Sequence, residues 1–192
     1  MDEWKQFQID HFNRMAENYD SSKRGIYTNS ISEALRGLIK GKDVLYIGCG
    51  TGTLIKNLSP KALHGIDISP GMIGQAIRNN PEHSFEVADA EEYTPKRRYE
   101  VIMIIECIDH MQNWKQVIRN MMPYTGTLIV STTPKKWYPI LRVMETLKLK
   151  MREGMNRWVP PSELEEFLGK CEKIKTEMEF AVIFVKRMNR SV

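Results

Sequence analysis

The chain has few cysteines and no long hydrophobic run, and both shortages limit what it can be. Its 192 residues include three cysteines, Cys49, Cys107 and Cys171, which form neither a CxxC metal motif nor a disulfide framework. This usage predicts a reducing, cytoplasmic location. The longest apolar runs, 101–105 and 181–185, have five residues. Because a helix that crosses a bilayer needs about 20, we expect a soluble protein.

Signal-peptide features, internal repeats and metal-ligand spacings are absent too. Charged residues interrupt the first twenty positions, which excludes the apolar core of a signal peptide. His11, His64 and His83 show no metal-ligand spacing, so we expect no metal site. A chain of this length can bury a core without covalent staples. We therefore expect one domain over residues 1–192.

Excess positive charge is confined to one segment. The formal net charge is only +4, yet residues 135–157 hold seven basic and two acidic side chains. In the same region Ile140, Met144, Leu147, Met151, Met155 and Trp158 recur every three or four positions, which predicts a methionine-rich apolar face on a helix. We call residues 135–158 the basic segment. Four roles stay open for this segment: a helix packed on the sheet edge, a lid over a hydrophobic or anionic acceptor, a peripheral membrane contact, or a dimer contact.

What the chain does contain is a regular alternation of strand-like and helix-like apolar patterns from Val44 onward. This alternation indicates βαβ units and a mainly parallel sheet. The expected strands are residues 44–47, 62–66, 84–87, 101–105 and 127–131, followed by a closing antiparallel hairpin of 173–177 and 181–186.

The expected helices have recognisable start signals. Ser69 followed by Pro70 indicates an N-cap, and the stretch Ser162 to Glu165 matches a capping box. Another helix is predicted over residues 113–122. Two helices over residues 3–17 and 29–39 precede the sheet, so residues 1–40 are expected to cover it.

A glycine-rich turn, Gly48 to Gly52, follows the first strand. Glycine permits positive φ and a close approach of ligand to backbone, and a helix start offers free N–H groups. Two later strands end in acids, Asp67 and Asp89. An acid at the end of the second strand is placed to accept ribose hydroxyls, and Asp89 suits an adenine amino group or the cap of a turn. A nicotinamide site fits less well, because the dinucleotide pattern requires its third glycine where Thr53 stands.

With these motifs the sequence resembles the class I S-adenosylmethionine-dependent methyltransferases, within them the type 11 group that includes ubiquinone and menaquinone C-methyltransferases. The resemblance spans nearly the whole chain, through residues 12–20, 44–52, 64–72, 99–110 and 160–169. It implies a three-layer αβα, Rossmann-like fold with a seven-stranded, mostly parallel sheet of order 3-2-1-4-5-7-6, in which the seventh strand is antiparallel. It also implies S-adenosyl-L-methionine as the cofactor.

The resemblance further implies which residues contact that cofactor. The glycines would lie against its methionine part, Asp67 on the ribose, and Asp89 with Ala90 at the polar edge of the adenine. The full expected set is Tyr19, Tyr46, Gly48, Cys49, Gly50, Gly52, Asp67, Ile68, Met72, Asp89, Ala90 and Ile105. One position departs from the family, because Tyr46 stands where relatives usually have an acid that helps to hold the cofactor's amino group.

Methyl transfer from a sulfonium depends mainly on positioning and on excluding water, so a dedicated base is optional. Glu106, Asp109 and His110 are the candidate catalytic residues, and for His110 a purely structural role is equally open. A water-bridged substitute, or Glu106 acting from the neighbouring strand, could compensate for the acid missing at Tyr46, and the sequence leaves both open. Cys107 is interpreted as a buried small apolar residue.

The leading hypothesis is an enzyme that methylates a small molecule. No Asn-Pro-Pro-Tyr or Asp-Pro-Pro-Tyr run follows the fourth strand, which disfavours exocyclic adenine and glutamine amide as acceptors. The alternatives are a cofactor-binding protein without transferase activity, which Tyr46 motivates, and a nucleic-acid methyltransferase that uses the basic segment. The acceptor atom and the oligomeric state stay open.

Overall fold

The computed structural model describes residues 2–20, 25–146, 157–176 and 181–188. Its centre is a seven-stranded sheet with the order β3-β2-β1-β4-β5-β7-β6. The strands are β1 Asp43–Ile47, β2 Ala62–Asp67, β3 Ser84–Val87, β4 Tyr99–Ile104, β5 Thr125–Thr132, β6 Glu172–Lys175 and β7 Val182–Arg187. β7 runs antiparallel to both of its neighbours, β5 and β6, and the other four strand pairs are parallel. The predicted strand order and closing hairpin are confirmed.

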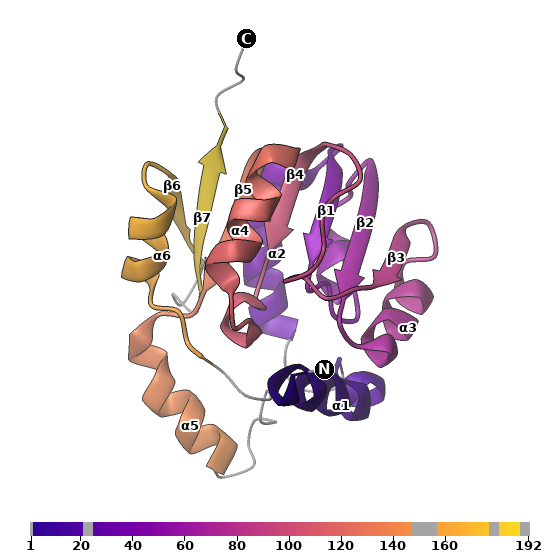
Figure 1. Cartoon of the computed structure of the whole chain (residues 1–192), viewed down its shortest axis with the longest axis vertical. Coiled ribbons are helices and arrows are strands. Elements are labelled where there is room, and N and C mark those ends of the chain that lie inside the picture. The colour runs from indigo at the N-terminus through magenta and orange to yellow at the C-terminus, as the bar shows by residue number, and fades with distance from the viewer. Residues whose placement is uncertain (1, 21–24, 147–156, 177–180, 189–192) are drawn as a thin grey trace.

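Helices lie on both faces of the sheet and across one of its ends (Figure 1). They are α1 Glu3–Met15, α2 Gly25–Ile39, α3 Pro70–Asn79, α4 Trp114–Met121, α5 Tyr138–Thr146 and α6 Pro161–Leu168. Short 3-10 helices cover Ala16–Asn18, Thr53–Asn57, Ile108–His110, Met122–Tyr124 and Lys135–Trp137. None of the helices described is long and apolar enough to cross a membrane.

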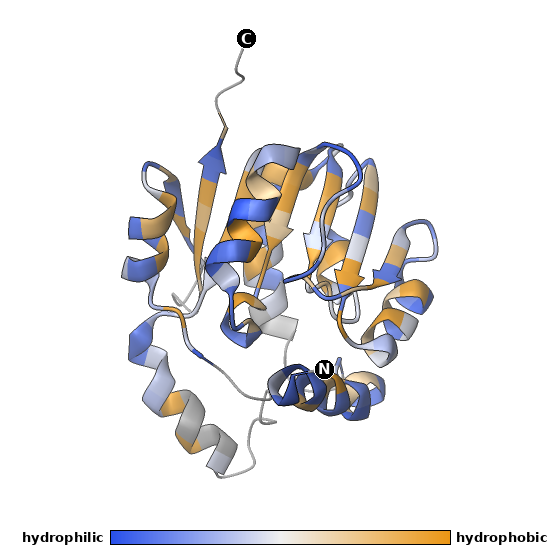
Figure 2. Cartoon of the chain, in the orientation of Figure 1, coloured by the Kyte–Doolittle hydropathy of each residue, from blue (hydrophilic) through white to orange (hydrophobic). Residues whose placement is uncertain are grey.

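The alternation of side chains along β1 divides the core into two layers. Val44 and Tyr46 pack with α2, α3 and the turn after β1, whereas Leu45 and Ile47 pack with α4 and α6. Figure 2 shows the hydrophobic strands enclosed between these helices, while α1 is largely hydrophilic. Because both faces are covered, the central strands are apolar throughout, as buried parallel strands usually are.

The helix start after the glycine turn is the short 3-10 helix Thr53–Asn57, which ends before Ser59 at φ 49° and Pro60. One local expectation is wrong. The predicted capping box at Ser162 does not form, since α6 begins at Pro161 and its N-cap is Pro160, without a side-chain cap. Proline already fixes the φ that the first helical residue needs, so the helix starts before a Ser162 cap can act.

The N-cap at Ser69 is confirmed, and its hydroxyl accepts from the amide of Met72 at 3.1 Å. In the basic segment, Tyr138 anchors the start of α5 by donating to the carbonyl of Thr133 at 3.0 Å and by stacking on Trp158 at 4.1 Å. Ile140 is 47% exposed. Residues 147–156, with three positions of the predicted apolar face, lie outside the described residues.

Candidate functional site

The carboxyl ends of β1, β2, β3 and β4 meet at one edge of the sheet, because these strands are parallel neighbours. Helix α1 crosses this edge (Figure 1). A pocket of about 110 Å³ lies beneath it. Sites at this edge are the rule in open α/β sheets, since the loops there are free to diverge. The glycine turn, both predicted acids and the loop after β4 all reach this pocket.

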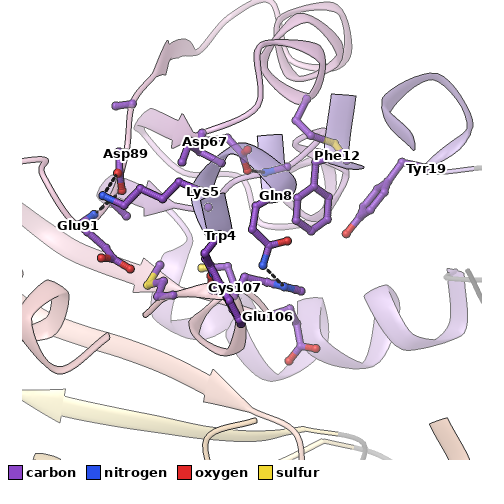
Figure 3. A pocket seen from close by; sticks show the side chains of 18 residues that line it. Trp4, Lys5, Gln8, Phe12, Tyr19, Asp67, Asp89, Glu91, Glu106 and Cys107 are labelled. Atoms are coloured by element: carbon purple, nitrogen blue, oxygen red, sulfur yellow. Dashed lines mark hydrogen bonds and ion pairs between the residues drawn. The ribbon is translucent and has the colours of Figure 1, made fainter. Parts of the chain in front are cut away.

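Ten of the fifteen predicted site residues line the pocket, and Figure 3 labels several of them. They are Tyr19, Gly48, Gly50, Asp67, Ile68, Met72, Asp89, Ala90, Glu106 and His110. The structure thus brings together residues from four separate loops and from the end of the amino-terminal helices. Their contacts with a cofactor remain a prediction.

Gly48 and Gly50 bring bare backbone to the pocket. Both have positive φ, 66° and 54°. A Cβ on Gly48 would stand 2.5 Å from Sγ of Cys107, so no side chain fits there. A Cβ on Gly50 would meet nothing within 4 Å, which leaves its pocket side open. The two glycines therefore allow a ligand to touch the main chain.

Asp67 is held by the main chain at the end of β2. One carboxylate oxygen accepts from the amide of Gly50 at 2.9 Å and the other from the amide of Ser69 at 2.9 Å. Burial raises the pKa of Asp67, and hydrogen bonds from backbone amides partly oppose that rise. Each carboxylate oxygen can accept a second hydrogen bond. The geometry therefore leaves Asp67 able to receive two hydroxyl groups while it fixes the glycine turn.

Asp89 has two roles in the fold. Its Oδ1 accepts from the amide of Glu91 at 2.9 Å, which is the turn-capping role left open by the sequence. Its Oδ2 lies 2.5 Å from Nζ of Lys5 in α1. Lys5 also pairs with Glu92 at 3.2 Å. The carboxylate of Asp89 raises the pKa of Lys5, so this ion pair joins α1 to the loop after β3 at neutral pH.

Glu106 is a residue in strained backbone at the end of β4. Its φ is 57°, a left-handed value that residues with a Cβ rarely adopt. The hydroxyl of Ser131 accepts from its amide at 2.9 Å and donates to its Oε1 at 2.9 Å. Ser131 is completely buried in β5. The neighbouring strand thus fixes both the backbone and the side chain of Glu106.

His110 is contacted by three side chains of α1. Trp4 Nε1 donates to its carbonyl at 3.0 Å, the amide of Gln8 lies 3.5 Å from its Nδ1, and the ring of Phe12 meets its imidazole edge to face at 5.2 Å. The imidazole lines the pocket. These contacts tie His110 to the helical cover beside the pocket.

Five predicted residues do not line the pocket. Tyr46 and Ile105 are 5% and 2% exposed and belong to the core between the sheet and α2, and burial holds the pKa of Tyr46 well above its usual range. Cys49 is buried and donates its amide to the carbonyl of Ile66 at 2.9 Å. Gly52 packs on α3, where a Cβ would stand 2.5 Å from Asn80.

The fifth is Asp109, whose carboxylate accepts from the amide of Val159 at 2.6 Å. The carbonyl of Asp109 also accepts from the amide of Arg157 at 2.8 Å. Asp109 therefore fastens the end of the basic segment to the loop after β4. This contact gives it a structural position rather than a place in the pocket.

Sequence reasoning missed eight lining residues, and half of them come from α1. These are Trp4, Lys5, Gln8, Phe12, Ala88, Glu91, Cys107 and Met111. The i, i+4, i+8 spacing of Trp4, Gln8 and Phe12 puts them on one helical face, which was a usable signal. Cys107 donates its thiol to the carbonyl of Ile47 at 3.2 Å, and burial raises its pKa, so it is a neutral wall of the pocket rather than a nucleophile.

The amino-acid sequence is similar to those of known methyltransferases. The model of the family described as "Methyltransferase domain" matches residues 15–170. The malonyl-[acyl-carrier protein] O-methyltransferase 1 of Ilyobacter polytropus is 26% identical over 177 residues, which cover 85% of this chain and 66% of that protein. The ubiquinone biosynthesis O-methyltransferase of Rhodopseudomonas palustris is 25% identical, over 72% of this chain and 61% of that protein. The chain thus spans about two thirds or less of these relatives.

Solved structures share the fold. DhpI in its complex with SAH superposes with a TM-score of 0.75 at 19% identity, covering 97% of this chain and 98% of DhpI. Magnesium protoporphyrin IX methyltransferase from Synechocystis, with bound SAM, has a TM-score of 0.68 at 18% identity, covering 98% of this chain and 99% of that one.

Proposed function

The chain belongs to the family of methyltransferase domains, and from that premise we propose that it transfers a methyl group from S-adenosylmethionine to a small-molecule acceptor. The observation that carries the proposal is the convergence of Gly48, Gly50, Asp67 and Asp89 on one pocket. Bare backbone, an acid that can accept ribose hydroxyls and a second acid beside apolar side chains are the groups that an adenosine with an amino-acid tail requires. The related structures crystallised with SAM and SAH agree with this choice.

The residues present fit that cofactor. At Gly48 a Cβ would collide with Cys107, so glycine is needed to bring the main chain to the pocket there, and open space faces Gly50. Asp67 would hold the ribose, while Met72, which is buried and lines the pocket, would lie beside the adenine with Ile68. Asp89 would accept from the adenine amino group. Apolar contacts beside a few placed polar groups are typical of sites that orient a nucleotide.

The cofactor, when bound, supplies a methyl group on a sulfonium, and the neutral thioether is a good leaving group. The chain's own residues position the reactants and exclude water from them. Helix α1 covers the pocket with Trp4 and Phe12. Glu106 and His110 border the same space. His110 is the better candidate to receive an acceptor's proton, because its imidazole lines the pocket whereas Asp109 is committed to Val159.

A small, at least partly apolar acceptor suits the described lining. Trp4, Phe12 and Met111 supply apolar surface beside the polar edge of His110. The named relatives act on a malonyl-[acyl-carrier protein] and in ubiquinone biosynthesis. We extend the proposal to the organisation of the chain, with residues 1–192 acting as one domain, residues 1–40 as its helical cover and residues 135–158 as its lid.

Calorimetry with S-adenosylmethionine and S-adenosylhomocysteine tests the proposal. Wild-type protein should bind both ligands. Asp67→Ala should lower the affinity for both at least tenfold, which corresponds to about 1.4 kcal/mol or more of binding free energy. Asp43→Asn, at the opposite end of β1 and paired with Arg97, is the matched control and should bind normally. Labelled methyl groups are then followed into phenols, amines, thiols and quinols. Absence of binding contradicts the proposal, and binding without transfer favours a non-catalytic binding protein.

A further inference from the structure

The pocket contains four carboxylates among its described residues, and they are not equivalent. Asp89 pairs with Lys5, and Glu91 accepts from the amides of Gln112 and Asn113 at 2.6 and 3.1 Å. Asp67 holds the glycine turn. Glu106 lies on the opposite side of the pocket from Asp89, next to Cys107 (Figure 3). One carboxylate therefore stands apart from the adenosine end assigned above.

Glu106 is followed by Cys107, which packs against Gly48 of the glycine turn. Sγ of Cys107 lies 2.5 Å from where a Cβ of Gly48 would stand. The wall formed by Gly48, Glu106 and Cys107 is thus one continuous part of the pocket. If adenosine occupies the end near Asp67 and Asp89, the amino-acid end of the cofactor extends toward this wall.

Ser131 fixes the carboxylate of Glu106 in this place. Its hydroxyl makes two hydrogen bonds of 2.9 Å with Glu106, one from the backbone amide and one to Oε1. The hydroxyl donated to a carboxylate stabilises negative charge there, which suits a fixed counter-ion better than a base that must take up a proton. A left-handed φ of 57° at a residue with a side chain persists only where its surroundings enforce it.

We propose that Glu106, held by Ser131, receives the α-ammonium group of S-adenosylmethionine, and that Ser131 is its positioning residue. This inference rests on the proposed function and reassigns Glu106 from base to cofactor ligand. It also accounts for Tyr46, whose side chain is buried in the core and does not line the described pocket. The negative charge that the ammonium requires comes from the end of β4 instead of from β1.

The test is a cycle between protein and ligand, measured by calorimetry. The ligands are S-adenosylhomocysteine and its analogue with hydrogen in place of the α-amino group. Glu106→Gln should lower the affinity for S-adenosylhomocysteine about tenfold or more, because a hydrogen bond to a charged group contributes about 1.5–3 kcal/mol. The affinity for the deamino analogue should stay within about twofold of the wild-type value. Ser131→Ala should show the same selectivity with a smaller loss, about fivefold, and Ser131→Thr, which keeps the hydroxyl, should restore binding.

Ser32→Ala is the matched control. Ser32 is a buried serine in α2 whose hydroxyl donates to the carbonyl of Thr28 at 2.7 Å. Removing this hydroxyl should not change the affinity for one ligand relative to the other. Equal losses for both ligands in Glu106→Gln would show a structural role and overturn the inference. Unchanged binding with slower transfer would show a base and overturn it too. Failure of the wild type to bind either ligand would instead reject the proposed function.

Discussion

The ammonium group of Lys5 lies 2.5 Å from Oδ2 of Asp89, and this ion pair joins the first helix to the end of the third strand above the pocket. The two side chains are 18% and 19% exposed. Asn13 adds a second attachment, since its side-chain oxygen accepts from the amide of Gly71 and from the hydroxyl of Ser69, both at 2.8 Å. The cover of the pocket is thus fixed by specific polar contacts, in addition to the small apolar cluster of Met15, Ala16 and Met72.

Lys5→Met should loosen α1 without unfolding the protein. Partly exposed ion pairs contribute about 1 kcal/mol or less, so the free energy of unfolding should fall by no more than that. Amide hydrogen exchange within α1 should accelerate, because this helix loses one of its attachments. Lys115→Met, which removes the exposed pair with Glu163 at 2.8 Å, is the control and should leave exchange in α1 unchanged. Unaltered α1 exchange in Lys5→Met would contradict the attachment.

Alanine substitutions at two glycines of α3 should have different effects on the stability of the protein. A Cβ on Gly74 would meet nothing closer than Nη2 of Arg78 at 4.0 Å, so Gly74→Ala should stabilise the protein by about 0.5–1 kcal/mol through helix propensity. A Cβ on Gly71 would lie 3.1 Å from Ala16 Cβ and 3.2 Å from Asn13 Cα. Gly71→Ala should therefore cancel that gain and displace α1. Urea unfolding of both variants measures the difference, and equal stabilisation would refute the tight contact.

Affinity for S-adenosylhomocysteine should depend on pH through Asp67. Burial raises the pKa of this carboxyl, and only its ionised form can accept two ribose hydroxyls. As pH falls through that raised pKa the carboxylate takes up a proton, and affinity should then decline by about tenfold per pH unit. The decline should begin above the ordinary aspartate range of about 3.9. In Asp67→Asn, binding should be weak and nearly independent of pH, whereas a pH profile like that of the wild type would assign the titration to another group.

The strain in the backbone at Glu106 should be measurable as a difference in stability between the variants Glu106→Gly and Glu106→Ala. Both Glu106→Gly and Glu106→Ala remove the carboxylate, but only glycine adopts φ 57° without steric cost. The glycine variant should therefore be more stable than the alanine variant by about 1 kcal/mol. Ser59, exposed and at φ 49°, provides the matched pair away from the pocket, and Ser59→Gly should stabilise similarly. Equal unfolding midpoints for the two Glu106 variants would show that the strain is not real.

Much of the fold follows from local patterns. The strand-and-helix alternation, the Ser69 cap and the short spacing of the last two strands depend on residues close in sequence, and each is confirmed. The capping box at Ser162 was wrong for an equally local reason, because the preceding prolines set the start of α6.

The sequence by itself determined the sheet, the glycine turn and the two acids at strand ends, since periodicity and turn chemistry are encoded in consecutive residues. Only the tertiary structure decided which neighbours face the pocket. Tyr46 lies in the core while Glu106 lines the pocket, and α1 brings Trp4, Lys5 and Gln8 over the site. Those outcomes depend on contacts between segments far apart in the chain, such as Ser131 with Glu106, and no local pattern specifies them.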